Sequence, residues 1–177
     1  YPQDKDSRWW KVAYPYPFRD LIELHGKAEK VPWNMIIGIM REESGFNPVV
    51  ESYAHALGLM QLLQKTASWV AGKQISRRRL RIPAENIPLG AKYLRYLLDK
   101  FNHPTLAVSG YNSGPGGVYK TLKRTRNREV DEFVEHIPYD QTRRYTKRVL
   151  SSAWSYQLLY GNKGGVIPFK LRFPKQK

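Results

Sequence analysis

The sequence predicts an all-α domain, and three observations lead to that prediction. Apolar residues recur at helical spacing in several segments, most clearly between residues 84 and 101. No stretch shows the sustained alternation of apolar and polar residues that a half-buried strand requires. The chain has 177 residues, of which 41% are hydrophobic, so it is long enough for one domain with a sizeable core.

The first half of the chain supports this prediction element by element. An N-terminal arm, residues 1–12, contains Trp9 and Trp10 and is expected to pack onto the domain. Residues 18–30 show helical spacing, and a second helix starts at Val31-Pro32, where proline is tolerated, and ends near Ser44. Glycine, serine and an Asn-Pro pair then predict a loop to Leu57, followed by short helical turns over residues 59–70.

The second half of the chain is predicted to contain the longest helices. Residues 84–101 form the clearest one, and residues 105–111 form a short one that the Gly-rich stretch 112–117 interrupts. Further helical segments are expected at 118–122, 129–136 and 140–160. These elements place the domain at residues 13–161 and leave residues 162–177 as a basic C-terminal tail.

The composition narrows the classes of function. The formal net charge of +15 favours a polyanionic partner such as nucleic acid, anionic lipid or an acidic cell-wall polymer. Cysteine is absent, which excludes disulfides and thiolate zinc sites, and the four histidines lack metal-ligand spacing. We therefore expect no metal and no cofactor. The densest basic run, Arg77, Arg78, Arg79 and Arg81, is either a polyanion-docking patch or, as the composition favours, a solvated helix end or loop.

Glu43 is the first candidate for chemistry. At about 100° per residue it falls within the apolar side of its helix, in line with Ile36 and Met40, whereas Glu42 falls outside it. Burial disfavours the carboxylate anion, and the negative end of the helix dipole disfavours it further. A carboxyl group that stays protonated near neutral pH is what a general acid for glycosidic cleavage requires. A glutamate in a last helical turn can also bend out into water.

Three segments in order resemble the signature of the soluble lytic transglycosylase family. They are Glu43-Ser44-Gly45-Phe46-Asn47-Pro48, Ser52-Tyr53-Ala54-His55-Ala56-Leu57-Gly58-Leu59-Met60-Gln61 and Gly110-Tyr111-Asn112-Ser113-Gly114-Pro115-Gly116-Gly117-Val118. A fourth stretch, residues 133–145, resembles the segment around the start of that family's final helix. The resemblance extends from about Ala13 to about Tyr160 and implies a lysozyme-like helical fold with a substrate cleft.

The resemblance also implies an activity and a site. The family cleaves the β-1,4 bond between N-acetylmuramic acid and N-acetylglucosamine in peptidoglycan. By resemblance Glu43 is the sole acid and then base, and the muramic C6 hydroxyl closes onto C1 as a 1,6-anhydro sugar without external water. The residues that would bind substrate are Ser52, Gln61, Tyr111 and Glu135. The residues that would shape the site are Gly58, Asn112, Gly114, Pro115 and Gly116.

Each of these assignments has a structural alternative. Ser52 could cap local backbone, Gln61 could be an exposed helix residue, and Tyr111 could be a core aromatic. Asn112 is expected to hold its turn by bonding to backbone, and Glu135 could be an ion-pair partner of Arg143.

The sequence departs from the family at several positions in or beside these motifs. His55 stands where glycine is usual, so a positive φ there would imply strain. Gln64 replaces a common proline, Leu63 a frequent methionine and Gly110 a frequent alanine. These changes leave the acid in place and bear on the shape of the cleft.

Two rival functions remain open at this point. One is a hydrolase of the same fold, like goose-type lysozyme, and the other is a non-catalytic basic module that binds nucleic acid or membrane. The transglycosylase reading predicts a monomer that binds peptidoglycan glycan strands and no nucleic acid. By resemblance it also predicts location in the periplasm or bacterial cell envelope.

Overall fold

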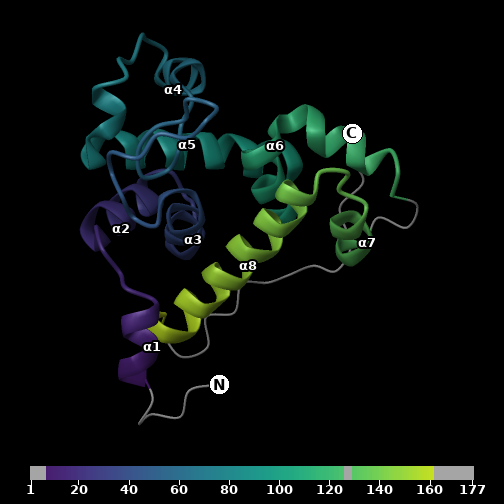
Figure 1. The fold of residues 1–177 in the computed structure, drawn as a ribbon, viewed down its shortest axis with the longest axis horizontal. Helices are drawn as coiled ribbons and strands as arrows, with labels where there is room; N and C mark the ends of the chain where they lie inside the picture. Colours follow the sequence, from purple (N-terminus) through teal and green to yellow (C-terminus); the bar gives the residue numbers. More distant parts are fainter. Residues whose placement is uncertain (1–6, 126–128, 162–177) are drawn as a thin grey trace.

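The computed structural model describes residues 7–125 and 129–161, and helices dominate both ranges (Figure 1). The helices are α1 (Ser7–Ala13), α2 (Arg19–Ala28), α3 (Trp33–Ser44), α4 (Gln64–Ala71), the 3-10 turn η1 (Arg79–Arg81), α5 (Pro83–Phe101), α6 (Pro104–Leu122), α7 (Val130–Glu135) and α8 (Asp140–Tyr160). Within these two ranges β-structure is limited to isolated bridge residues, including the pairs Glu51–Leu57 and Leu57–Leu62. The all-α prediction is therefore confirmed, while residues 162–177 of the predicted tail lie outside the described ranges.

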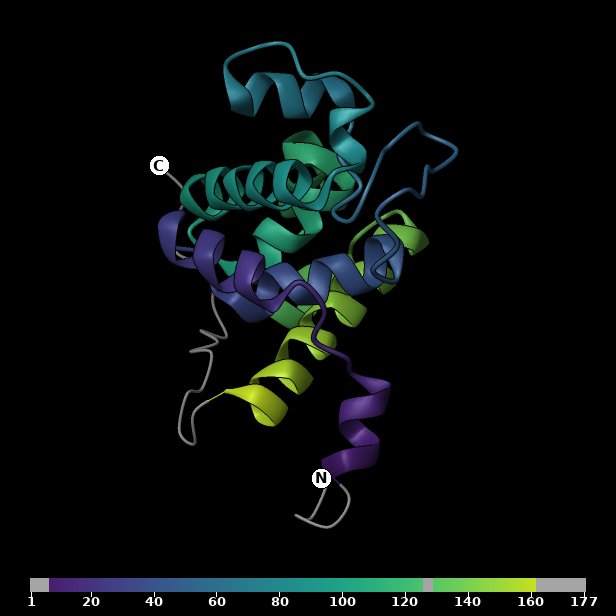
Figure 2. The same ribbon diagram turned by 90° about the vertical axis from the view of Figure 1, so that its left-hand side faces the viewer.

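Helix α3 forms the centre of the fold and packs along α8, as Figures 1 and 2 show from two directions. Every residue from Asn34 to Met40 is buried, so this helix is enclosed on nearly all sides. A methyl group at Gly38 would lie 3.1 Å from the Val149 carbonyl oxygen, and glycine therefore lets the two backbones approach closely. This packing fixes the C-terminal end of α3, where Glu43 lies, against α8.

The N-terminal segment is tied to the same pair of helices. The Tyr156 and Tyr160 hydroxyls of α8 donate to the carbonyl oxygens of Pro15 and Tyr14, each at 2.7 Å. The Arg41 guanidinium lies 4.2 Å from the centre of the Tyr14 ring. Part of the predicted arm is thus helix α1, which lies beside the C-terminal half of α8 (Figure 1).

Two segments differ in detail from the sequence prediction. The break in residues 112–117 is confirmed, because Gly114 interrupts α6 with φ 71° and ψ 166°. The helical turns predicted over residues 59–70 are confirmed only from Gln64, where α4 begins; before it, positive φ values at Gly58 (77°) and Gln61 (45°) turn the chain. The segment between α3 and α4 is therefore a folded loop, and it carries the second sequence motif.

Candidate active site

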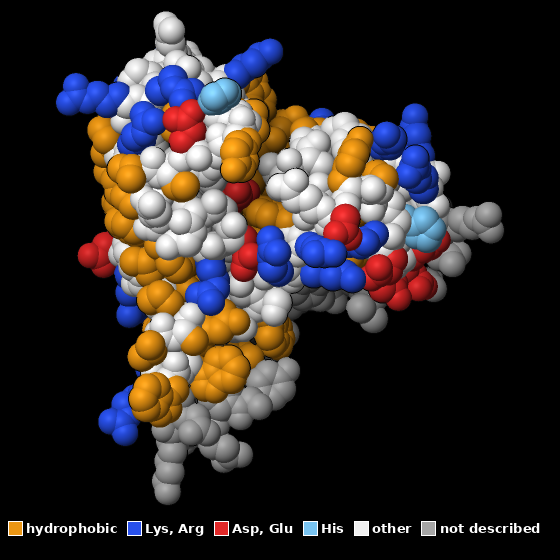
Figure 3. Space-filling model, in the orientation of Figure 1, with side chains coloured by type: hydrophobic (Ala, Val, Ile, Leu, Met, Phe, Trp, Pro, Cys, Tyr) orange, Lys and Arg blue, Asp and Glu red, His pale blue; other side chains and the backbone are white. Residues whose placement is uncertain are grey.

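Glu43 lies one residue before the end of α3, and Gly45 ends that helix in the left-handed region with φ 55°. The residue is partly buried, so its side chain is neither in the sealed core nor in bulk solvent. The pKa of its carboxyl group is raised from 4.5 to about 7, mainly by burial; the Tyr145 hydroxyl lowers it and the charge of Glu42 raises it, both to a smaller extent. The sequence prediction of an acid that stays protonated near neutral pH therefore holds in the structure. Figure 3 shows a hollow in the middle of one face, between the part formed by α2 to α5 and the part formed by α6 to α8.

Two buried tyrosines flank this carboxyl group. The Tyr111 hydroxyl of α6 donates to the Met60 carbonyl oxygen at 3.0 Å. The Tyr145 hydroxyl of α8 is also buried, with no partner at hydrogen-bonding distance among the described residues, and its interaction with Glu43 opposes the rise in the Glu43 pKa. Burial first, and the Glu43 charge second, raise the pKa of both phenols. Both therefore remain neutral hydroxyls around the acid.

The two glutamates closest to Glu43 in sequence are both held by other groups. Glu42 accepts from Arg148 Nε at 2.8 Å and from Ser152 Oγ at 3.0 Å, which fixes it to α8. Glu51 is bound by Arg77, Arg81 and His55. Glu43 differs from both of them, because it forms no ion pair with any of the described residues.

The loop after α3 is folded over by hydrogen bonds from its own motif residues. Ser44 Oγ donates to the Leu59 carbonyl oxygen at 2.8 Å and so joins the end of α3 to the loop. Ser52 Oγ accepts from the Ala56 amide at 3.1 Å, the capping role that the sequence left open. Gln61 Nε2 donates to the carbonyl oxygens of Gly58 and Val50. Its Oε1 remains for other contacts, and the binding of substrate by Ser52 and Gln61 stays a prediction.

Asn86 of α5 anchors this loop and was missed by sequence reasoning. The residue is fully buried, donates from Nδ2 to the Leu57 and Leu80 carbonyl oxygens, and accepts from the Met60 amide at 2.7 Å. Its position in the sequence could have revealed it. Asn86 falls on the same helical stripe as Leu94 and Leu97, and a polar side chain on a buried stripe needs hydrogen-bond partners.

Gly58 lies directly against this anchor. A Cβ atom there would lie 2.1 Å from the Leu80 carbonyl oxygen and 2.5 Å from the Asn86 amide nitrogen. The predicted shaping role of Gly58 therefore has a steric basis in addition to its φ of 77°.

In the third motif, the side chain of Asn112 links α6 to α8. Asn112 Oδ1 accepts from the Thr142 hydroxyl at 2.7 Å. The prediction that the Asn112 side chain bonds to local backbone is therefore wrong, because its oxygen accepts from a residue of α8 that lies 30 positions away in sequence. The break itself lies at Gly114, whereas Pro115 and Gly116, which were predicted to shape it as well, are helical residues that follow it.

The ion-pair partner of Glu135 differs from the one considered in the sequence. Its carboxylate binds Lys147 Nζ at 2.6 Å and is exposed, while Arg143 binds Asp140. The Arg143 pairing is thus wrong, and a role for Glu135 in substrate binding stays a prediction.

The family departures have local structural reasons. His55 has a positive φ of 62°, the backbone conformation that implies strain for a residue other than glycine. Its Nδ1 lies 2.9 Å from a Glu51 oxygen. Gln64 Nε2 donates to the Ile75 carbonyl oxygen at 2.9 Å, a bond that proline could not make. Alanine at Gly110 would bring a Cβ 3.1 Å from the Phe101 ring, so glycine leaves room for it.

The raised pKa of Glu43 predicts a pH dependence of stability. The native state keeps the Glu43 proton up to about pH 7, whereas the unfolded chain loses it near pH 4.5. The free energy of unfolding should therefore fall by about 3 kcal/mol between pH 4.5 and pH 7.5, relative to a Glu43→Gln variant. Urea unfolding of both proteins across this pH range measures the difference in the free energy of unfolding. The contributions of the other titrating groups are common to both proteins and cancel. A difference that is constant with pH, or that rises, would contradict a desolvated Glu43.

The described residues contain no group of three or more His, Cys, Asp or Glu side chains that could hold a metal ion. Among the helices within these ranges, none is both long and apolar enough to cross a membrane. Of the predicted basic patch, Arg77 and Arg81 pair with Glu51 and Arg79 pairs with Glu85, so much of its charge is balanced.

Comparison with known proteins gives a consistent result. Residues 20–134 match the family described as Transglycosylase SLT domain. The soluble lytic murein transglycosylase of Escherichia coli (strain K12) is 33% identical over 181 residues, covering 89% of this chain and 28% of that protein. Membrane-bound lytic murein transglycosylase C of Histophilus somni (strain 2336) is 36% identical over 152 residues, covering 71% of this chain and 42% of that protein.

Solved structures agree with these relatives. The 70 kDa soluble lytic transglycosylase of Escherichia coli superimposes with a TM-score of 0.85 at 30% identity, over 93% of this chain and 28% of that one. The same protein has been solved in complex with bulgecin A. An inactive Glu-to-Gln mutant of lytic transglycosylase Slt from Pseudomonas aeruginosa gives 0.80 at 35% identity, over 86% and 26% of the two chains. The chain thus spans about a quarter of the length of these soluble relatives.

Proposed function

Because this chain belongs to the Transglycosylase SLT domain family, we propose that it is a lytic transglycosylase of peptidoglycan. It cleaves the β-1,4 bond between N-acetylmuramic acid and N-acetylglucosamine and leaves 1,6-anhydromuramic ends. The observation that carries this proposal is the partly buried Glu43 carboxyl with a pKa of about 7. Such a group carries a proton to donate near neutral pH and accepts one back with similar ease.

The reaction follows from that single group. Glu43 donates its proton to the bridging oxygen as the bond to C1 of the muramic residue breaks. The resulting carboxylate takes the proton from the C6 hydroxyl of the same sugar while O6 bonds to C1. Glu43 is then protonated again, and no water is consumed. Glycosidases with two catalytic carboxylates need a second one as base or nucleophile, whereas Glu42 and Glu51 are bound to cations here.

The surroundings of Glu43 support both steps. The neutral hydroxyl of Tyr145 has no hydrogen-bond partner among the described residues. It is therefore free to donate to the Glu43 carboxylate that forms when the proton leaves. Tyr111 bonds to the Met60 carbonyl oxygen, which holds the second motif beside the acid. The Tyr145 hydroxyl thus stabilises the charged form of Glu43 when the reaction creates it.

Mass spectrometry of peptidoglycan digests tests the proposal. A transglycosylase releases muropeptides whose muramic ends are one water lighter than the reducing ends that a hydrolase releases. Anhydro products from the wild-type chain would support the proposal, and reducing ends would favour the lysozyme-like alternative. A basic binding module, in contrast, would bind DNA in a salt-sensitive way that persists in Glu43→Gln and would release no muropeptides.

The net charge of +15 further supports attraction to an anionic cell wall in the bacterial envelope. Among the four arginines of the basic patch, Arg78 is the one that makes no ion pair with the described residues. The other three bind Glu51 or Glu85. Reversing the charge of Arg78 therefore tests docking without breaking a structural pair.

We expect Arg78→Glu to weaken binding to isolated sacculi by about two- to fivefold at low salt, and less at high salt. Cleavage of short soluble glycans should stay unchanged, because they need no extended surface. Co-sedimentation with sacculi measures the first effect, and Lys27→Glu on α2 is the control with the same change in charge. Equal losses on both substrates, or equal losses in both variants, would count against a docking patch.

A further inference from the structure

The carboxylate next to the candidate acid is held in place from another helix. Glu42 precedes Glu43 in α3, and its side chain is only 14% exposed. Arg148 Nε of α8 donates to Glu42 Oε2 at 2.8 Å, and Ser152 Oγ donates to Glu42 Oε1 at 3.0 Å. The two donors are one helical turn apart, so both oxygens of the Glu42 carboxylate are bonded to the same face of α8.

This contact belongs to the closest part of the interface between α3 and α8. A Cβ added at Gly38 would lie 3.1 Å from the Val149 carbonyl oxygen. Asn34 Nδ2 donates to the Ala153 carbonyl oxygen at 3.3 Å. Each of these α8 residues directly follows one of the residues that hold Glu42. The position of the Glu42 carboxylate is therefore fixed by the same packing that fixes the end of α3.

The charge of Glu42 affects its neighbour in α3. Burial is the main cause of the raised Glu43 pKa, the Tyr145 hydroxyl lowers it, and the Glu42 charge raises it. A guanidinium group bound to Glu42 opposes that last effect, because its positive charge offsets the negative one. Removing Arg148 would leave the Glu42 charge uncompensated and its side chain without its cation.

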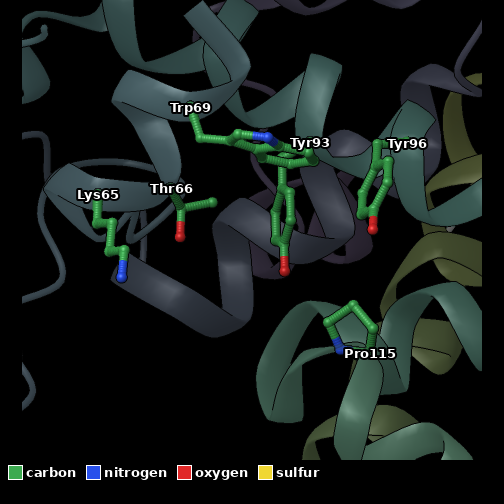
Figure 4. Close-up of a pocket in the computed structure, with 6 residues that line it drawn as sticks. All are labelled: Lys65, Thr66, Trp69, Tyr93, Tyr96 and Pro115. Atoms are coloured by element: carbon green, nitrogen blue, oxygen red, sulfur yellow. The ribbon is translucent and has the colours of Figure 1, made fainter.

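The phenols of Tyr111 and Tyr145 also lie near Glu43, and both are neutral. Burial keeps the pKa of each phenol high. The ring of Tyr93 on α5 lies 5.2 Å from the Tyr111 ring, and it lines a pocket together with Lys65 of α4 (Figure 4). None of these four side chains brings a negative charge to the site near neutral pH.

The charged side chains next to Glu42 and Arg148 in sequence are bound to other partners. Arg41 donates to the Ala13 carbonyl oxygen, and in the loop after α3 the carboxylate of Glu51 is bound by two arginines. On α8, Arg143 and Arg144 bind Asp140, and Lys147 binds Glu135. Arg148 is thus the cation that the structure pairs with Glu42.

We propose that Arg148 is a positioning residue of the candidate active site, which holds the Glu42 carboxylate against α8 and so limits its influence on the Glu43 proton. The inference rests on the proposed function, because this proton is the one that the reaction transfers. Arg148 acts through Glu42 rather than on the substrate. The pair sets the pH range in which Glu43 can both donate and accept a proton.

NMR titration of Glu43 measures this influence directly. In isotope-labelled protein, the side-chain carboxyl carbon of Glu43 is followed as the pH is raised, and its signal is identified by its loss in Glu43→Gln. Arg148→Gln should raise the Glu43 pKa by about half a pH unit or more, because the Glu42 charge is no longer offset. Arg148→Lys keeps the positive charge and should restore most of the original value.

Two further variants separate this role from a general effect of charge. In a Glu42→Gln background, Arg148→Gln should shift the Glu43 pKa by less than about a third as much, because the residue through which it acts is gone. Arg144→Gln is the matched control, since it removes the same charge one turn earlier on α8 and breaks a surface pair with Asp140. It should leave the Glu43 pKa within about 0.2 of the parent value.

The same shift should appear in the proposed reaction. With a short soluble glycan as substrate, kcat/KM falls as Glu43 loses its proton, so the alkaline limb of the pH profile reports its pKa. That limb should move to higher pH in Arg148→Gln and stay in place in Arg144→Gln. The Arg148 side chain is 58% exposed, so the fold should remain intact, and thermal unfolding of each variant checks this.

Three results would overturn the inference: a Glu43 pKa that is unchanged or lower in Arg148→Gln, an equal rise in Arg144→Gln, or a shift of full size in the Glu42→Gln background. A purely structural role would lower activity at every pH and leave the midpoint of the alkaline limb where it was. The NMR titration needs no substrate, so it judges the role of Arg148 even if wild-type digests lack anhydro ends and the proposed function fails.

Discussion

Replacing Glu43 by glutamine is expected to lower the release of anhydromuropeptides by about 10³-fold or more. Glutamine preserves the size of the side chain but can neither donate the proton to the bridging oxygen nor accept one from the C6 hydroxyl. Both halves of the reaction lose their only proton carrier, so the loss should exceed that for an enzyme with separate acid and base. The measurement is the initial rate of muropeptide release from sacculi.

Glu42→Gln is the matched comparison, since the two glutamates are neighbours in α3. The Glu42 carboxylate is bound by Arg148 and Ser152, so its loss affects the reaction only by lowering the Glu43 pKa slightly. We expect it to keep activity within about tenfold of the wild type. Activity that survives Glu43→Gln, or that falls equally in both variants, would show that the proton carrier is another group.

Substituting alanine at Gly58 is expected to cost about 3–5 kcal/mol of the free energy of unfolding. The new methyl group would overlap the Leu80 carbonyl oxygen at 2.1 Å and the Asn86 amide at 2.5 Å. Both contacts are rigid, because Asn86 is fully buried and bonded to three backbone groups. The loop that carries Ser52 and Gln61 must then shift, so activity should fall along with stability. Urea unfolding measures the loss.

Gly72→Ala separates the clash from the backbone conformation. Gly72 also has a positive φ, 63°, but no atom lies within 4 Å of the Cβ that alanine would add. Its substitution should cost only about 1–2 kcal/mol, the price of a left-handed residue. Similar losses at the two glycines would mean that Gly58 is required for its φ alone. The side chain of Asn86 would then be able to move away from the added methyl group.

The sequence predicted those parts of the site that depend on periodicity and motif order. Helical spacing predicted a desolvated carboxyl group at Glu43, and the Gly-rich stretch predicted the break at Gly114. These features are local, because a helix face or a glycine turn is determined by residues a few positions apart.

The partners of polar side chains were harder to predict, since they come from distant segments. The partner of Asn112 is Thr142, and that of Glu135 is Lys147 rather than Arg143. Pairing within the basic patch requires knowing that Glu51 and Glu85 lie beside η1. Asn86 stands 26 residues from the Met60 amide that it holds, so only the tertiary fold brings the two together.

The dependence of the Glu43 pKa on its surroundings has a consequence for damaged molecules. Its proton affinity comes from desolvation by the assembled helices, and those that contribute Tyr111 and Tyr145 are far away in sequence. Once α8 or α6 separates from α3, water reaches the carboxyl group and its pKa returns toward that of an ordinary glutamate. A partly unfolded copy would thus be ionised at neutral pH and unable to donate the proton that the proposed reaction needs, so that this reaction would be confined to molecules whose tertiary structure is intact.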